Sequence, residues 1–266
     1  MKSRFKLGSA LVLATVVVLA GCAGGAKNTK ELATTSDQTQ LQNRAMIRLQ
    51  LAIGYLGQRQ LEVALDEVKQ ALQSDPEFAD AYLVRALIYI EMKETALAEE
   101  NFMRALRIAP NNPEFNNNFG WFLCENKREN DAMKYFEAAL KVQSYASPEK
   151  ALNNAGKCAL KMQKRDVAEE YFRRAFRLDP GYTPTNVNLA GLYFEKRDYE
   201  RAQFYLSRVT KTGRTDELPA DVLWLAIRLE RKLGDSRAEA ALVTQLRRHH
   251  ASSPEFRAWQ RGAFDE

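Results

Sequence analysis

The stretch at residues 76–110 reads PEFADAYLVRALIYIEMKETALAEENFMRALRIAP, and it decides the fold. It begins and ends with proline, and Pro76 and Pro110 are 34 residues apart. Between the two prolines lie two segments with apolar residues at helical spacing, joined by a polar turn around Lys93. A two-helix unit that recurs every 34 residues predicts a stack of helical hairpins, because one hairpin alone does not bury its apolar face.

The same register extends in both directions from this unit. Repeats begin at Ala45, Ala79, Pro113, Glu149, Thr183 and Pro219. A small residue recurs in the middle of each first helix: Ala52, Ala86, Gly120, Gly156, Ala190 and Ala226. An alanine recurs early in each second helix: Ala64, Ala98, Ala132, Ala168, Ala202 and Ala238. Four residues later stand Val68, Phe102, Phe136, Phe172, Leu206 and Leu242. Helical spacing places these on one face, where small residues let two helices approach and a bulky residue fills the space opposite.

Six repeats in register predict an all-α solenoid. Pro76, Pro110 and Pro180 are expected to end the second helices that precede them, because proline breaks the helical hydrogen-bond ladder. The stretch from Pro254 to Phe264 carries three aromatic residues, and we expect a capping helix there that covers the open end of the stack.

The N-terminus has the layout of a secretory signal peptide. Cationic Lys2, Arg4 and Lys6 precede an apolar run over residues 10–20, which is shorter than the ~20 residues of a membrane-spanning helix. The run ends in Leu19-Ala20-Gly21-Cys22, which resembles the bacterial lipobox. The resemblance implies that Cys22 is acylated; an ordinary signal peptide that ends near a cysteine is the alternative. Ala23 stands where lipoproteins of the inner membrane usually carry Asp, so the implied location is the periplasmic face of the outer membrane.

These observations divide the chain into four segments. Residues 1–21 are the predicted lipoprotein signal peptide, and residues 22–43, rich in Gly, Ala, Thr, Ser, Gln and Asn, are a predicted flexible linker. Residues 44–252 hold the six repeats and residues 253–266 the capping helix. Three of the five net positive charges belong to the signal peptide, so the remaining chain is nearly balanced and has no basic stripe of the kind that binds nucleic acid.

No sequence motif for catalysis is present. The chain has no phosphate loop, no H-E-x-x-H and no G-x-S-x-G, which predicts a protein without enzymatic activity, cofactor, metal or small-molecule substrate. His249 and His250 are adjacent on a predicted helix, point in different directions and are expected to be solvated. Cys124 and Cys158 lack C-x-x-C spacing; an oxidising periplasm would allow them to pair, but buried single thiols are the expectation.

The residues that face the concave side of the stack are the candidates for partner binding. They form an apolar set on the first two repeats, followed by a more polar set on the next two: Met46, Leu49, Ile53, Leu56, Leu83, Leu87 and Ile90, then Asn117, Trp121, Asn153 and Lys157. Packing against neighbouring helices is the alternative role for the leucines. The recurring small and bulky residues already fill the core, so an additional apolar stripe on the first two repeats would leave an exposed patch unless a partner covers it. An amphipathic helix or an extended strand from another protein could occupy that patch.

The repeats over residues 45–252 resemble the tetratricopeptide repeat family, which implies a right-handed superhelix. The chaperone-binding members of that family hold a carboxylate with five side chains, of which only Asn118 and Lys150 are matched here, so no such clamp is expected.

The segments NNFGWFLC at 117–124 and LNNAGKC at 152–158 resemble the type IV pilus biogenesis and stability lipoproteins, the pilotins of the pilus secretin. That resemblance implies a monomer that binds outer-membrane secretin subunits and promotes their localisation and multimer assembly, and so serves pilus biogenesis and twitching motility. A repeat scaffold of outer-membrane or cell-wall assembly machinery is the alternative.

Overall fold

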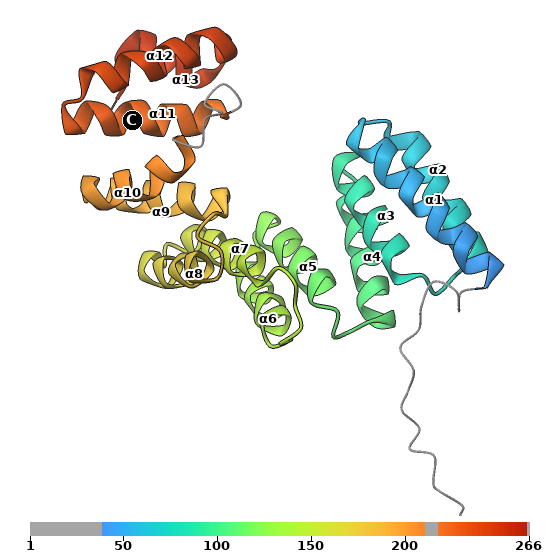
Figure 1. Cartoon of the computed structure of the whole chain (residues 1–266). Helices are drawn as coiled ribbons and strands as arrows, with labels where there is room; N and C mark the ends of the chain where they lie inside the picture. The colour runs from blue at the N-terminus through green and yellow to red at the C-terminus, as the bar shows by residue number, and fades with distance from the viewer. Residues whose placement is uncertain (1–38, 211–217, 265–266) are drawn as a thin grey trace, which may run out of the picture. The chain divides into compact units, whose positions relative to one another are not determined.

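The computed structural model describes residues 39–210 and 218–264, which form thirteen helices (Figure 1). Twelve of them pair into six hairpins: α1 (Gln40–Gly57) with α2 (Leu61–Ser74), α3 (Ala79–Glu91) with α4 (Thr95–Ile108), α5 (Pro113–Glu125) with α6 (Glu129–Leu140), α7 (Pro148–Lys161) with α8 (Arg165–Leu178), α9 (Thr183–Glu195) with α10 (Tyr199–Thr210), and α11 (Ala220–Leu233) with α12 (Ser236–His250). The last helix is α13 (Pro254–Arg261). Cys22, the predicted signal peptide and the linker up to residue 38 lie outside the described residues.

Each hairpin packs against the next in chain order. The second helix of one hairpin contacts the first helix of the following one, as α2 does α3 and α6 does α7. First helices also contact one another, as α5 does α7 and α7 does α9. This is the all-α repeat stack that the 34-residue register predicts, and it leaves a row of first helices available to form a groove.

The recurring small and bulky residues make the core of each hairpin. The middle small residue of all six first helices is buried, and Phe102, Phe136 and Phe172 are fully buried on the second helices. A Cβ atom placed on Gly156 would lie 2.5 Å from Cε1 of Phe172, and one on Gly120 would lie 2.9 Å from the Phe136 ring. These two glycines are therefore required by close approach of the paired helices.

Helix ends follow the expected chemistry, with one difference. α2, α4 and α8 each end two residues before the proline that was expected to end them, which is Pro76, Pro110 or Pro180. At the other end of the array, α1 begins at Gln40, inside the segment predicted as linker. The reason is a capping box: the Thr39 hydroxyl accepts from the Gln42 backbone amide, and the Gln42 side chain accepts from the Thr39 amide.

The C-terminal end of the array is covered by α13, which contacts α11 and α12. Phe256 is buried, and the Phe264 ring lies 5.3 Å from that of Trp224. His250 differs from the expectation of a solvated residue: it is half-buried, and its Nε2 lies 2.8 Å from the carbonyl oxygen of Leu218. The packing of the end of α12 beside the start of the sixth repeat brings these two groups together, while His249 is exposed.

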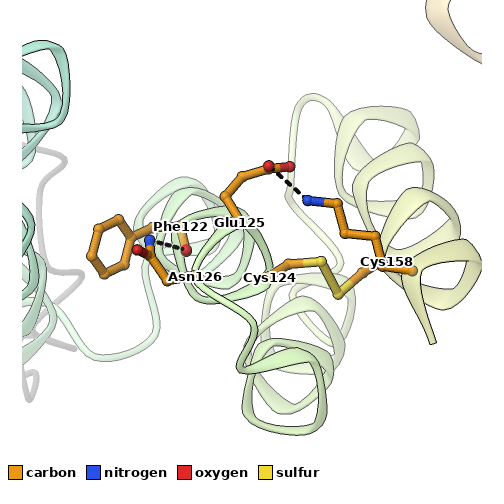
Figure 2. Close-up of a disulfide and its surroundings, with 6 residues drawn as sticks. Phe122, Cys124, Glu125, Asn126 and Cys158 are labelled. Carbon is orange, nitrogen blue, oxygen red and sulfur yellow. Dashed lines mark hydrogen bonds and ion pairs between the residues drawn. A yellow bond between two sulfur atoms is a disulfide. The ribbon is translucent and has the colours of Figure 1, made fainter. Parts of the chain in front are cut away.

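Cys124 and Cys158 form a disulfide, so the expectation of two single thiols is wrong (Figure 2). Both side chains are buried, and their Cα atoms are 5.8 Å apart, one on α5 and the other on α7. The cysteines are 34 residues apart, whereas the third and fourth repeats begin 36 residues apart, so the two cysteines are not equivalent in the register. They meet because the first helices α5 and α7 contact one another. Beside the disulfide, Lys161 Nζ lies 2.6 Å from Glu125 Oε2 and adds an ion pair between the same two helices.

We predict that Gly156→Ala destabilises the protein by about 1–3 kcal/mol, because the added methyl group forces the Phe172 ring or the helix pair apart. Urea unfolding followed by circular dichroism measures the change. Gly54→Ala is the matched control, since nothing beyond its chain neighbours and the backbone of its own helix lies within 4 Å of its Cβ position. There we expect no loss, and a gain of up to about 1 kcal/mol. Equal losses in both variants would contradict the packing argument.

Removal of the disulfide is expected to lower the free energy of unfolding by about 3–4 kcal/mol, the loop-closure value for a 34-residue separation. The comparison is between the oxidised protein and the Cys124→Ser/Cys158→Ser variant in urea, with both single variants included. A double variant as stable as the oxidised protein would show that the link between α5 and α7 does not contribute to stability.

Candidate protein-binding groove

An apolar cleft crosses the first three repeats on the side of the first helices. It has a volume of about 300 Å³ and is lined by α1, α3 and α5 together with the turn after α1: Leu56, Gly57, Arg59, Leu87, Ile90, Glu91 and Trp121. Four of the predicted groove residues, Leu56, Leu87, Ile90 and Trp121, are thus brought together. All four are half-buried, which leaves part of each side chain available to a bound segment.

The other predicted apolar residues divide into two groups. Leu49 and Leu83 are only 6% and 9% exposed and belong to the hydrophobic core, as the alternative interpretation of the leucines had it. Met46 is half-buried, and Ile53 is 51% exposed on α1. Of the predicted groove residues on α1, Ile53 is therefore the one that projects furthest into solvent.

The middle of the first-helix row is held together by side-chain amides. Asn154 on α7 donates to the Oδ1 atom of Asn117 on α5 at 3.0 Å. Asn188 on α9 donates to Oδ1 of Asn153 on α7 at 2.8 Å, and the Thr185 hydroxyl donates to the same oxygen at 3.2 Å. The two acceptor residues, Asn117 and Asn153, are buried, and the hydrogen bonds to their side-chain oxygens join the first helices of adjacent repeats. Lys157, by contrast, is exposed.

The third and fourth repeats begin 36 residues apart, at Pro113 and Glu149, so two residues are inserted around positions 144–148. This insertion is anchored on α5. Tyr145 is buried, and its hydroxyl donates to Oε2 of Glu114, in the first turn of α5, at 3.0 Å. Burial raises the pKa of Tyr145, and the negative charge of Glu114 raises it further, so the phenol remains a neutral donor. This contact and the disulfide connect the insertion and α7 to the same helix.

Two charged residues at the cleft were not predicted. Arg59 Nη2 lies 4.0 Å from Glu91 Oε2, and both side chains are exposed enough to rearrange when a partner binds. Arg59 lies in the turn between α1 and α2 with φ 59°, a geometry that recurs at Lys93, Lys127, Gln163 and Arg197. The register therefore marks Arg59 as a turn residue, whereas its place at the cleft comes from the packing of α1 beside α3.

The described residues contain no cluster of three or more histidine, cysteine, aspartate or glutamate side chains arranged to hold a metal ion. In the same part of the chain, no helix has the length and apolar character needed to span a membrane. The cleft itself presents apolar surface from four side chains and one charge of each sign at its edge.

Comparison with known proteins agrees with this architecture. Tetratricopeptide repeat models match residues 49–113, 101–134 and 159–223. The type IV pilus assembly protein PilF of Pseudomonas aeruginosa is 30% identical over 258 residues, a match that covers 95% of this chain and 97% of that protein.

Two solved structures extend the likeness to three dimensions. The crystal structure of PilW, a widely conserved type IV pilus biogenesis factor, matches with a TM-score of 0.72 at 32% identity and covers 84% of this chain and 100% of that one. A structure of PilF from Pseudomonas aeruginosa matches with a TM-score of 0.73 at 29% identity, with the same coverage. The chain is therefore a tetratricopeptide repeat protein and belongs to the family of the type IV pilus assembly protein PilF.

Proposed function

We propose that this protein is an outer-membrane lipoprotein that binds subunits of the type IV pilus secretin and promotes their localisation and multimer assembly. The observation that carries the proposal is the apolar cleft of the first three repeats, in a chain similar over almost its whole length to a pilus assembly protein. The repeat scaffold and the pilus assembly relatives support a role in protein interaction rather than catalysis.

The cleft suits a segment with one apolar face. Leu87, Ile90 and Trp121 offer apolar surface from two helices, while Arg59 and Glu91 offer hydrogen bonds at the edge. An amphipathic helix or a strand of a secretin subunit would bury its apolar side there and keep its polar side in water. In this mechanism the groove shields a segment that would otherwise aggregate before the secretin inserts into the membrane.

Attachment at Cys22 would deliver the complex to the membrane. The lipobox-like sequence at residues 19–22 supports acylation of that thiol. A single acyl chain binds a membrane reversibly, whereas the several chains of a lipoprotein hold it there stably. A monomeric protein anchored in this way carries one secretin segment per cleft.

We predict that the double variant Ile53→Glu/Leu87→Glu loses secretin multimers by at least tenfold. A carboxylate at exposed Ile53 and one at half-buried Leu87 would both lose water when an apolar partner covers them. Leu49 and Leu83 are unsuitable for this test, since charge in the core would unfold the repeat. Heat-resistant secretin multimers are measured in membranes, and circular dichroism verifies the fold. Val63→Glu, at an exposed apolar position on α2, is the matched control.

Intact multimers in cells that carry the folded double variant would overturn the groove assignment. Co-purification in mild detergent adds a second measurement. Secretin subunits in the eluate support the proposal, and an eluate with outer-membrane insertase or cell-wall enzymes but no secretin would favour the scaffold alternative.

Acylation has its own test. Cys22→Ser is expected to move the protein from the outer-membrane fraction to the soluble or inner-membrane fraction and to abolish incorporation of a clickable palmitate analogue. Since Cys124 and Cys158 are paired, they do not compete for the label. Continued incorporation in the variant would contradict modification at Cys22.

A further inference from the structure

The outward face of α1 is an exposed apolar surface at the end of the array opposite to α13. Ile47 is 58% exposed and Leu51 is 42% exposed, and both line a shallow hollow together with Arg44 and Arg48. This surface is distinct from the cleft, whose lining residues on α1 are Leu56 and Gly57.

The repeat register explains why this face is apolar. The residues equivalent to Ile47 in the next four repeats are all buried at interfaces between hairpins: Ala81, Phe115, Ala151 and Thr185. The equivalents of Leu51 in the third, fourth and fifth repeats are buried too: Phe119, Ala155 and Leu189. In later repeats this face is covered by the preceding hairpin, and among the described residues no hairpin precedes α1. The face is thus built as an interface and needs something to cover it.

The charges of α1 indicate what covers it. The helix Gln40–Gly57 contains two arginines and no aspartate or glutamate. Arg44 is exposed, whereas Arg48 pairs with Glu67 of α2 at 2.9 Å and lies at the edge of the hollow. An apolar strip beside a free arginine is the arrangement of helices that lie in the interface of an anionic membrane, with the guanidinium at the phosphates and the apolar side chains at the acyl boundary.

The position of α1 in the chain favours the same occupant. Thr39, which caps α1, is 17 residues after Cys22. A chain of that length spans at most about 60 Å, so an acyl anchor at Cys22 keeps α1 within reach of the bilayer whatever path the intervening residues take. No such connection holds a second copy of the protein near α1. The effective concentration of lipid surface at this face is therefore far higher than that of a second copy.

We propose that the outward face of α1, formed by Ile47, Leu51 and Arg44, docks on the anionic phospholipid surface to which the protein is anchored. The inference rests on the proposed acylation of Cys22. Ile53 lies six residues after Ile47, about 120° away around the helix. Docking through Ile47 therefore directs the groove side of α1 away from the lipid and leaves the cleft open to a secretin segment.

The experiment places a nitroxide label at Ile47→Cys or at Ile53→Cys in the acylated full chain. The two positions are matched, because both are isoleucines on α1 with exposures of 58% and 51%. The protein is reconstituted into vesicles of phosphatidylethanolamine and phosphatidylglycerol in a 7:3 ratio, and collision rates with oxygen and with a nickel chelate give the depth of each label. We expect the label at 47 to be at least fivefold less accessible to the nickel chelate than the label at 53. Equal accessibility would overturn the proposal.

Two further arms separate the alternatives. Adding Arg44→Glu/Leu51→Glu, at exposed positions that leave the core intact, should restore nickel access at 47; unchanged protection would overturn the proposal. A short distance between the labels at position 47 of two copies, measured by double electron–electron resonance, would assign the face to a dimer instead.

If no protein remains with the vesicles, the anchor and this inference fail together. Loss of secretin multimers in the groove variant, with the label at 47 still protected, would show that the two sites act independently.

Discussion

The structure depends on how closely two antiparallel helices of a hairpin approach. A residue no larger than alanine in the middle of each first helix meets a bulky apolar residue of the second helix, and at Gly156 even a methyl group would collide with Phe172. Because a small residue is buried at this position in all six hairpins, successive hairpins present similar faces and stack. The first helices then form a row, and side chains of that row line the candidate groove.

The chemistry of that row changes from the first repeats to the middle ones. At the first three repeats it forms an apolar cleft, whereas at the third to fifth repeats it is joined by asparagine side chains and by the bond between Cys124 and Cys158. The amides and the disulfide hold neighbouring first helices at fixed spacing. An apolar cleft at one end and a cross-linked segment in the middle are properties of the array that no single hairpin has.

The sequence predicted the hairpins well, because the packing that defines them recurs at fixed intervals. It predicted the surface less well. Leu49 and Leu83 occupy positions that face the groove in the register, yet neighbouring side chains bury them, and burial depends on contacts between repeats that a single-repeat pattern does not contain. The disulfide and the contact of His250 with Leu218 likewise join segments more than 30 residues apart. The start of α1 was missed for a local reason, the capping box at Thr39.

The covalent link between α5 and α7 also affects how the array comes apart. A linear array is stabilised by each unit and by each nearest-neighbour interface, so it frays from its ends and opens wherever an interface is weakest. In this protein the third and fourth repeats stay tethered at Cys124 and Cys158 while the sulfur–sulfur bond is intact. After a local opening the two repeats remain next to each other, and hairpins that fray from either end re-form on this tethered pair. Refolding after a local opening is then templated, and it does not require a new nucleation event.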